Sequence, residues 1–391
     1  MDDRARVSAI REQLPAVNRY AYLNTGTYGP MPLACERAVR EWLADELAEG
    51  RIAPGRMPRG AAVKEGARAA LARLLGADPT EIALTRNTTE GMNAAVFGRN
   101  WSPGDEIVTT NVEHGGGTLP VRLAERRFGA VVRVADFRRA EGDVRPLVEP
   151  LLNERTKMVA LSHVSWSTGA LFDLKPLAQL CRERGILLAV DAAQAAGAIP
   201  VDLHDLGVDY YAFPGQKWLM GPSGTGGFYA RADRLAETLP AWIGTGAVAS
   251  HDDLDDFELW ADGRRFEGAS TANLAAYAGL AAAVNWLLDE VGAEWACGRA
   301  ARLADRAIAG LRRIPGVEVV TPGHRAPLVC FKVAGHAPAD VTKHLAANGV
   351  VGRSVNDTGV VRFSTGFYNT EEEIDRAVNL VAELVGAKVA P

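Results

Sequence analysis

The chain has 391 residues, 48% of them hydrophobic and 23% charged, which is an ordinary composition for a globular protein that can bury a large core. Lys and Arg number 43 against 48 Asp and Glu, so the formal net charge of −5 gives no support to a nucleic-acid binder or a polybasic membrane binder. Four cysteines, Cys35, Cys181, Cys297 and Cys330, are scattered without CxxC spacing; we therefore expect no disulfide framework and no cysteine zinc site or other metal site, and a reducing cytoplasm fits.

The N-terminal 20 residues are charged from the second residue onward and lack the apolar stretch that a signal peptide needs. We expect them to form an arm with one short helix, followed by a Gly- and Pro-rich loop over 22–32. The most apolar segment, 274–288, is too short to span a bilayer and contains Asn285, so we expect a buried helix there and no membrane contact.

Helical spacing of apolar residues covers 35–47 and 61–75. From Glu81 onward short apolar runs alternate with helix-like segments; the runs are EIALT, EIVTT, AVVRVAD, MVALSH, ILLAVD and YYAFP. Several are apolar throughout, which is typical of parallel strands covered by helices on both faces. The sequence therefore predicts an α/β fold with a mostly parallel sheet, and such sheets bind ligands at the carboxyl ends of their strands.

The pattern changes in the last third of the chain, where a long helical stretch up to about residue 313 precedes short alternating strands and a final helix. This pattern predicts a smaller α+β domain. We therefore divide the chain into an arm over 1–20, a large domain over 21–270 and a small C-terminal domain over 271–391, with a boundary that is soft by several residues.

Two charged residues follow consecutive predicted strands. Asp191 ends the run LLAVD, and Lys217 lies 26 residues later in PGQKWLMGPSGTGG, after the strand YYAFP. Either residue alone would be interpreted as a helix cap or a solvated loop charge. Because neighbouring parallel strands end at the same edge of a sheet, the pair predicts an acid and an amine in one crevice.

Five segments carry a resemblance to a known family: SHVSWSTG, AVDAAQAAG, PGQKWLMGPSGTGG, RFEGAS and RFSTGFYNTEEEID. They resemble the class V aminotransferases, the fold-type-I pyridoxal 5′-phosphate (PLP) enzymes that include cysteine desulfurases, cystine lyases and isopenicillin-N-epimerase-like proteins. The resemblance extends from YLNTGTYGP to YNTEEEID, nearly the whole chain. It implies PLP as the cofactor, a large PLP-binding domain with a smaller α+β domain, and a homodimer.

The resemblance also assigns roles to the strand-end residues. Lys217 would hold PLP as a Schiff base and then move protons at the substrate Cα. Asp191 would pair with the pyridine nitrogen, where an anion favours the protonated ring, and Gln194 would donate to the phenolic oxygen. His114 matches the position whose ring stacks on the cofactor; a plain polar strand-end residue is the alternative.

Phosphate binding is implied for a second group of residues. Thr88 and Thr89 match the family's phosphate-binding turn, at a predicted helix start where the positive end of the dipole lies; a plain N-cap is the compatible alternative. Gln216 precedes the lysine where relatives often have His, so its amide would make the phosphate contact. Ser270 and Thr271 match a hydroxyl that reaches the phosphate of the neighbouring subunit in relatives, which implies shared active sites in a dimer.

The resemblance assigns substrate binding to Arg362, which matches the arginine that binds the substrate α-carboxylate through its planar guanidinium group. The alternative is an exposed arginine on a strand. Asn24 and Thr27 match an N-terminal loop that lines the substrate pocket. Trp166 replaces the asparagine of the common SHVxN motif, as in the cystine-lyase and epimerase branch.

Cysteine desulfurases carry a nucleophilic cysteine shortly before that arginine. The corresponding segment here, 352–364, contains none, and Cys330 lies in an apolar strand where it is better interpreted as a small buried hydrophobe. RFEGASTAN is also one residue longer than the desulfurase pattern. The sequence therefore favours a C–S lyase that acts on an amino acid by α,β-elimination without a catalytic cysteine.

Three alternatives stay open at this point. An aminotransferase is not excluded. A racemase or epimerase would need an acid on the opposite face of Cα, and no residue of the sequence can be identified as that acid. The non-enzyme alternative is a PLP-binding regulator. Such regulators usually add a DNA-binding helix-turn-helix domain, for which the short N-terminal arm leaves no room.

Overall fold

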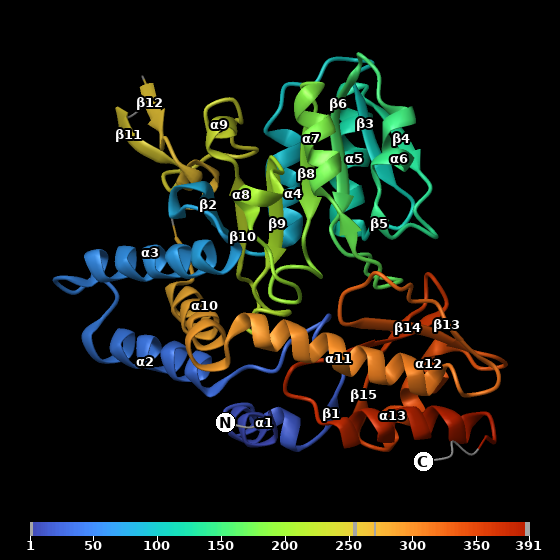
Figure 1. Cartoon of the computed structure of the whole chain (residues 1–391). Coiled ribbons are helices and arrows are strands. Elements are labelled where there is room, and N and C mark those ends of the chain that lie inside the picture. The colour runs from blue at the N-terminus through green and yellow to red at the C-terminus, as the bar shows by residue number, and fades with distance from the viewer. Residues whose placement is uncertain (1–2, 253–255, 270, 388–391) are drawn as a thin grey trace.

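The computed structural model describes residues 3–252, 256–269 and 271–387. Figure 1 shows a large domain built on one sheet in the upper part of the view and a smaller sheet with its own helices at the lower right. Helices α2 (Leu33–Glu49) and α3 (Arg56–Leu75) extend to the left and pack with α10 (Leu274–Asn285). The helical segments expected over 35–47 and 61–75 are therefore present.

The large sheet has seven strands in the order β2-β10-β9-β8-β6-β3-β4. Their bounds are Ile82–Thr85 (β2), Gly226–Ala230 (β10), Tyr210–Pro214 (β9), Leu187–Asp191 (β8), Thr156–Ser162 (β6), Glu106–Thr110 (β3) and Val131–Ala135 (β4). The pairs from β9 to β4 are parallel, and β10 is antiparallel to both of its neighbours. The predicted mostly parallel sheet is confirmed, and each of the six apolar runs forms one of its strands.

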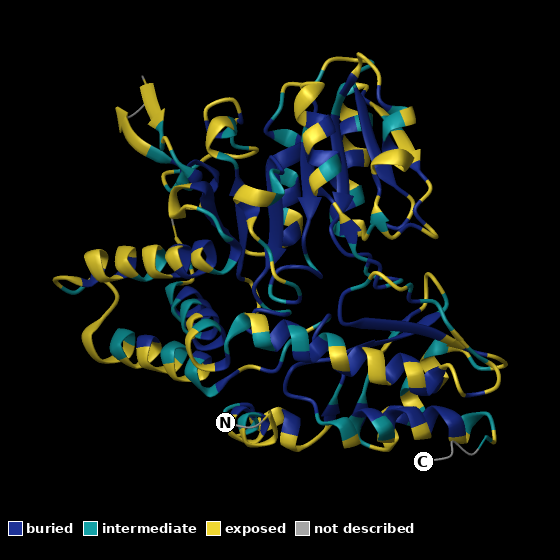
Figure 2. Ribbon diagram, in the orientation of Figure 1, coloured by how far each residue is buried: buried dark blue, intermediate teal, exposed yellow. Residues whose placement is uncertain are grey.

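The central strands are largely apolar because the sheet separates two cores. Along β6, Met158 and Ala160 pack on one face, while Val159 and Leu161 pack on the other. The first face is covered by α4 (Thr88–Phe97) and α5 (Gly115–Phe128). The second face is covered by α3, α7 (Lys175–Glu183) and α10. Figure 2 shows the result: the strands from β2 to β3 are almost entirely buried, the edge strand β4 is largely exposed, and the helices are exposed along their outer faces.

The sequence analysis did not predict β10, whose sequence is GGFYA. Gly226 and Gly227 are required there by close packing, since a Cβ would lie 2.4 Å from the Phe213 carbonyl oxygen at Gly226 and 2.3 Å from the Phe213 ring at Gly227. Glycine lowers strand propensity, so local sequence gave no signal for a strand that the tertiary structure imposes.

The small sheet has the order β13-β14-β17-β16 and is antiparallel. Its strands are Val317–Val319 (β13), Leu328–Val333 (β14), Val360–Ser364 (β17) and Arg353–Val355 (β16), and its helices are α11 (Ala293–Leu311), α12 (Pro338–Ala347) and α13 (Glu371–Leu384). The predicted α+β pattern of this part of the chain is present. The N-terminal segment also joins it: β1 (Ala21–Tyr22) pairs in parallel with β15 (Val350–Val351), and Arg11 of α1 (Asp3–Glu12) forms an ion pair of 2.9 Å with Glu373.

The long helix expected after residue 270 is interrupted. The α10 helix passes into a π-helical turn, η5 (Trp286–Val291), and Gly292 with φ of 80° separates it from α11. A left-handed glycine allows the chain to change direction without strain. The domain division at 270/271 stays a prediction. Helix α10 lies C-terminal to that division, yet its residues Leu280 and Val284 belong to the core that packs against the large sheet.

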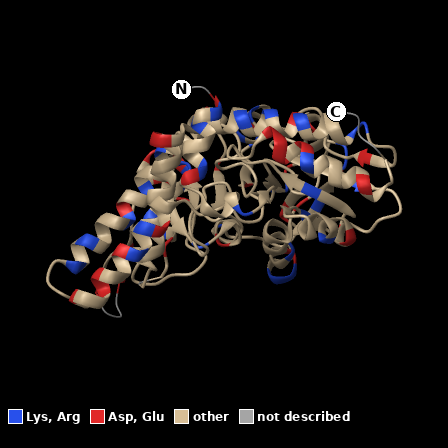
Figure 3. Cartoon of the chain, turned by 90° about the horizontal axis from the view of Figure 1, so that it is seen from below, with Lys and Arg blue, Asp and Glu red and all other residues tan. Residues whose placement is uncertain are grey.

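Short elements complete the described chain: η1 (Pro15–Asn18), η2 (Pro79–Glu81), β5 (Gly142–Asp143), α6 (Arg145–Val148), η3 (Glu149–Leu151), β7 (Phe172–Asp173), α8 (Leu203–Leu206), α9 (Ala232–Leu235), β11 (Val248–Asp252), β12 (Asp256–Leu259) and η4 (Gly263–Phe266). Seen from below, acidic and basic residues are interspersed over the helices (Figure 3). Among the helices described, none has the length and apolar character needed to cross a membrane.

Candidate active site

A cavity of about 250 Å³ lies at the carboxyl ends of the large sheet, where strand-end residues face two strands of the small sheet. Its walls include these residues that the sequence analysis assigned to the cofactor: Thr88, Thr89, His114, Asp191, Gln194, Gln216 and Lys217. They also include the residues Thr27, Trp166 and Arg362, which were assigned to the substrate. The fold thus brings together in one cavity ten side chains from segments far apart in the sequence.

Lys217 and Asp191 lie on adjacent parallel strand ends, as expected. Asp191 is 5% exposed and ends β8, and Lys217 follows β9. Burial raises the pKa of Asp191, partly offset by a 2.9 Å hydrogen bond from the Ala193 N–H and by the charge of Lys217. The described side chains of Asp191 and Lys217 form no ion pair with each other, so both remain free to meet a ligand.

The amine of Lys217 is prepared for nucleophilic chemistry. Burial lowers the pKa of Lys217 to about 8, and the positive charges of Arg362 and Arg353 act in the same direction. The negative charge of Asp191 raises the pKa and so opposes this shift. A lysine that loses its proton near neutral pH is a usable nucleophile and base.

The start of α5 forms the wall beside Asp191. His114 is the N-cap, and its Nδ1 accepts a 3.0 Å hydrogen bond from the Gly116 N–H. A Cβ on Gly117 would lie 3.2 Å from Asp191 Oδ2, and one on Gly116 would lie 2.8 Å from Thr89 Oγ1. The glycines after His114 therefore let a helix N-terminus, with its positive dipole end, approach the carboxylate closely.

The ring of His114 faces Trp166 edge-on, with centroids 5.0 Å apart and planes at 89°. Burial of part of the ring, together with the nearby charge of Lys217, holds the pKa of His114 below its ordinary value. A neutral imidazole at neutral pH suits a residue that packs on another ring.

Gln194 is held by two hydrogen bonds. Its Nε2 donates to the Gly26 carbonyl at 2.8 Å, and its Oε1 accepts from Trp218 Nε1 at 2.9 Å. A primary amide has two donor hydrogens, so one N–H of Gln194 is left for a ligand in the cavity. Gly26 permits this contact, because a Cβ there would lie 2.8 Å from Gln194 Oε1 and 2.7 Å from Ser364 Oγ.

The other end of the cavity fits a phosphate. Helix α4 begins at Thr88, and its N-cap is Asn87, whose side chain accepts a 2.9 Å hydrogen bond from the Glu90 N–H. The cap is thus not made by either threonine. The Gln216 amide oxygen is buried without a partner among the described residues, and turning the amide would present its NH₂ instead. Backbone N–H groups, hydroxyls and an amide at a helix start form the donor set that a phosphate group needs.

Arg362 is buried, at 3% exposure, so the alternative of an exposed strand arginine is wrong. Its guanidinium donates to the Trp166 carbonyl at 3.0 Å and to Thr27 Oγ1 at 3.1 Å, while Nε has no partner in the described chain. Burial lowers its pKa to about 10. Asn24 does not line the cavity; its Oδ1 accepts a 2.7 Å hydrogen bond from the Thr27 hydroxyl and so holds Thr27 against Arg362.

Arg353 lines the same cavity and was not singled out from the sequence. It lies on β16 directly opposite Arg362 in the β16–β17 ladder, and it forms no ion pair or hydrogen bond recorded for the described residues. The hairpin was detectable in principle, since the turn residues NDTG separate the short segments RSV and VVRFS. Ser162 and Asn87 are further lining residues that the analysis left without a role.

Ser270 and Thr271 were assigned to the phosphate of a neighbouring subunit. Thr271 is exposed and lines a separate cavity of about 280 Å³ together with Glu267, Trp242 and Tyr277. Ser270 lies outside the described residues. Their proposed contact with a second subunit is therefore not tested by a single chain.

The cysteines do not reach the site. All four are buried and free, and burial raises the pKa of each thiol to about 12. None is among the residues that line the 250 Å³ cavity. The described cavity therefore offers an amine and two guanidinium groups but no thiolate.

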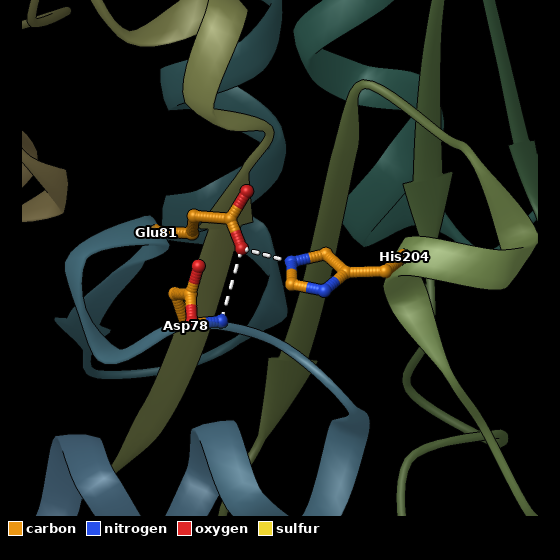
Figure 4. Close-up of side chains that lie close together, drawn as sticks. All are labelled: Asp78, Glu81 and His204. Atoms are coloured by element: carbon orange, nitrogen blue, oxygen red, sulfur yellow. Dashed lines mark hydrogen bonds and ion pairs between the residues drawn. The ribbon is translucent and has the colours of Figure 1, made fainter.

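One cluster in the described chain has the composition of a metal site. Asp78, Glu81 and His204 place one ligand atom each within 4.8 Å of the others (Figure 4). Glu81 Oε2 already accepts from His204 Nε2 at 2.6 Å and from the Asp78 N–H at 3.0 Å, and Oε1 accepts from the Ala232 N–H at 2.9 Å. Because these acceptors are occupied, the cluster serves to tie η2 to α8 and α9.

Comparison with known proteins gives one family match and many relatives. The model of the family "Aminotransferase class-V" matches residues 32–377. A "probable cysteine desulfurase" of Methanothermobacter thermautotrophicus is 31% identical over 97% of this chain and 98% of its own length. Another, from Mycolicibacterium paratuberculosis, is 35% identical over 82% of this chain, and the match spans 49% of that protein.

Solved structures agree with these matches. The cystine C–S lyase C-DES, in complex with its reaction product cysteine persulfide, superposes with a TM-score of 0.91 at 29% identity, covering 95% of this chain and 99% of that one. A mutant of C-DES carries glycine covalently linked to its PLP cofactor. The cysteine desulfurase CsdA of Escherichia coli gives a TM-score of 0.86 at 28% identity, covering 97% and 98% of the two chains.

The depressed pKa of Lys217 gives a direct prediction for the protein without added ligands. Reductive methylation proceeds only on a neutral amine, so the labelling rate of Lys217 should be half-maximal near pH 8. Asp191→Asn should move that midpoint to lower pH, because the carboxylate is the charge that opposes the shift. Peptide mass spectrometry over a pH series would measure this, with the exposed Lys343 in the same digest to normalise reagent strength. A midpoint at the ordinary lysine value of about 10.4 would contradict the described burial of the amine.

Proposed function

The chain belongs to the class-V aminotransferase family, and from this premise we propose that it is a PLP-dependent C–S lyase that removes a sulfur group from Cβ of an amino acid by α,β-elimination. The single observation that carries the proposal is the cavity itself. It combines an amine of lowered pKa, an opposed acid and two guanidinium groups with no cysteine among its lining residues.

The described residues fit the proposed cofactor. Lys217 would hold it through its amine, Asp191 would face the pyridine nitrogen, and the free N–H of Gln194 would reach the phenolic oxygen. The start of α4 and the Gln216 amide would hold the phosphate. When bound, PLP supplies an electron sink that stabilises the negative charge left on Cα when its proton is removed.

The chain's own residues then place and move the substrate's groups. Arg362 binds the α-carboxylate, with its guanidinium fixed by the Trp166 carbonyl and the Thr27 hydroxyl, and so presents the Cα–H bond to Lys217. Lys217 takes the Cα proton as general base, for which a pKa near the working pH is favourable. The rings of His114 and Trp166 pack edge-on against each other at the cavity wall.

The leaving group departs from Cβ directly. For cystine, cleavage of the Cβ–S bond gives cysteine persulfide, and addition of water to the remaining three-carbon unit gives pyruvate and ammonium, so one water is consumed. This route needs no thiol on the enzyme. It is supported by the lack of cysteine in residues 352–364 and by thiols that are buried with pKa values raised to about 12.

The charge of the cavity points to a substrate with two carboxylates. Arg353 and Arg362 lie side by side without an acid partner in the described chain, and Asp191 is the one acidic residue that lines the cavity. Arg362 accounts for the α-carboxylate, so Arg353 is available for a second one. Cystine has such a second carboxylate, and it is the substrate named for the neighbour C-DES.

We further propose that the enzyme is a cytoplasmic homodimer with shared active sites. Thr271 is exposed at a cavity lined by Trp242, which is itself 41% exposed, as expected of a surface that a second subunit covers. The described cysteines are all free, which fits a reducing compartment, and cell fractionation would test this location. Sedimentation equilibrium should find the dimer at assay concentrations; an active monomer would contradict the shared site.

The reaction class leads to the following prediction. With PLP and cystine the protein should release pyruvate, ammonia and a persulfide, and replacing all four cysteines with alanine should leave kcat within about threefold. Single replacements serve where the quadruple variant does not fold. Loss of turnover with fold and cofactor retained would favour a cysteine desulfurase. A keto acid released without ammonia would favour an aminotransferase, and an inverted amino acid would favour an epimerase.

Variants of the two arginines should differ in which substrates show a raised KM. Arg362→Ala should raise KM for every amino-acid substrate by about 10- to 100-fold, the size of a lost charge-assisted hydrogen bond, and lower kcat where positioning is lost. Arg353→Ala should raise KM for cystine by about tenfold and change KM for cysteine less than about twofold. The exposed Arg313→Ala is the matched control. Equal effects of Arg353→Ala on both substrates would contradict a role in binding the second carboxylate.

A further inference from the structure

Glu113 is an acid behind the cavity that the proposed mechanism leaves unused. It lies in the loop between β3 and α5, directly before His114, and is partly buried. It is not among the residues that line the cavity.

Its carboxyl group joins two strand ends. Thr110, the last residue of β3, donates to Glu113 Oε1 at 2.6 Å, and the Ser162 hydroxyl is hydrogen-bonded to Oε2. Ser162 is the last residue of β6, lines the cavity, and is the ladder partner of Asp191 on β8. Glu113 therefore contacts a residue of the cavity wall from behind, next to the acid that would face the cofactor.

No cation neutralises Glu113 in the described part of the chain. Two other buried acids, in contrast, have such partners: Glu106 has Arg133 at 2.9 Å, and Glu267 has Lys64 and Arg68 at 2.6 Å each. Burial raises the pKa of Glu113 to about 7, the hydroxyls of Ser162 and Thr110 oppose this, and the negative charge of Asp191 adds to it. An acid without a cation partner keeps its proton over part of the neutral range.

The other titratable groups around Glu113 do not supply that missing charge. His114, at the start of α5, has its pKa lowered, and its Nδ1 is engaged by the Gly116 N–H. His163, which follows Ser162, bonds to the Tyr211 hydroxyl, and burial lowers its pKa to about 4. Both imidazoles are therefore neutral near pH 7, and Lys217, with a pKa of about 8, forms no ion pair with Glu113 among the described residues.

The proton on Glu113 decides what Ser162 can do, because a serine hydroxyl has one hydrogen to donate. When Glu113 is ionised, Ser162 must donate that hydrogen to Oε2. When Glu113 is protonated, Oε2–H donates to Ser162 Oγ while Thr110 continues to donate to Oε1. The hydrogen of Ser162 is then free to point into the cavity.

We propose that Glu113 is a positioning residue whose proton turns the Ser162 hydroxyl toward the cavity, where it donates a hydrogen bond to the bound cofactor. This role rests on the proposed function, since PLP is the ligand concerned. It makes cofactor binding tighter while Glu113 is protonated and weaker once it ionises. Glu113→Gln fixes the favourable state, because its amide nitrogen donates to Ser162 and its amide oxygen accepts from Thr110 at every pH.

The first experiment uses the protein without PLP and does not depend on the proposed function. Infrared difference spectra of wild type against Glu113→Gln should show the carbonyl stretch of one protonated carboxyl group at pH 6, lost with a midpoint near pH 7. Glu183→Gln, which removes an exposed carboxyl at the end of α7, is the matched control and should not change that band. A midpoint near the ordinary glutamate value of about 4.3 would overturn the proposal.

The second experiment measures PLP affinity by quenching of tryptophan fluorescence across pH 6 to 9. Wild type and Glu113→Gln should bind equally at pH 6, and the variant should bind about three- to tenfold more tightly at pH 8.5, the size of one hydrogen bond. Titration of Lys217 is common to both proteins and cancels in this ratio. A ratio that stays constant with pH would overturn the link to Ser162.

A third variant keeps the test independent of whether Glu113→Gln folds. Ser162→Ala removes the donor, so its PLP affinity should lack the component with a midpoint near pH 7, and adding Glu113→Gln to it should give no further gain. If the double variant gains as much as the single one, Glu113 acts by another path and the proposal fails. If no variant binds PLP at all, the proposed function fails, while the infrared result still decides the protonation of Glu113.

Discussion

The site depends on two opposite charges held apart inside the protein. Lys217 and Asp191 lie at the ends of adjacent parallel strands, and burial disfavours the charged form of each, lowering the pKa of the lysine and raising that of the acid. A direct ion pair would relieve this, yet the two described side chains do not form one. A ligand that bears complementary groups can therefore pair with both buried residues.

The surrounding elements explain how this separation is maintained. The ladder fixes Asp191 between Ser162 and Ala212, and the start of α5 approaches it through Gly117. On the opposite side the small sheet supplies Arg362 and Arg353, while Asn24 and Thr27 of the N-terminal segment hold the first of these in place. One wall therefore comes from the large sheet and the other from the small sheet and the N-terminal segment, so the cavity brings the residues proposed to bind the cofactor opposite those proposed to bind carboxylates.

Much of this arrangement could be predicted from sequence, and the remainder has physical causes. The apolar runs identified the parallel strands, since both faces of the sheet are covered, and so placed Asp191 and Lys217 correctly at one edge. Strand β10 was missed because its glycines are selected by the Phe213 ring and backbone, which are distant in sequence. Arg353 was missed because its place opposite Arg362 depends on hairpin register, and the contact of Thr271 with a second subunit stays a prediction.

The central claim is that Lys217 is the residue to which the cofactor attaches, opposite Asp191. Borohydride reduction of the protein loaded with PLP, followed by peptide mapping, tests it most directly. We expect one label, on Lys217, and loss of the visible absorbance band in Lys217→Ala while the fold is retained. A label on another lysine, or no visible band from folded wild-type protein after addition of PLP, would contradict it.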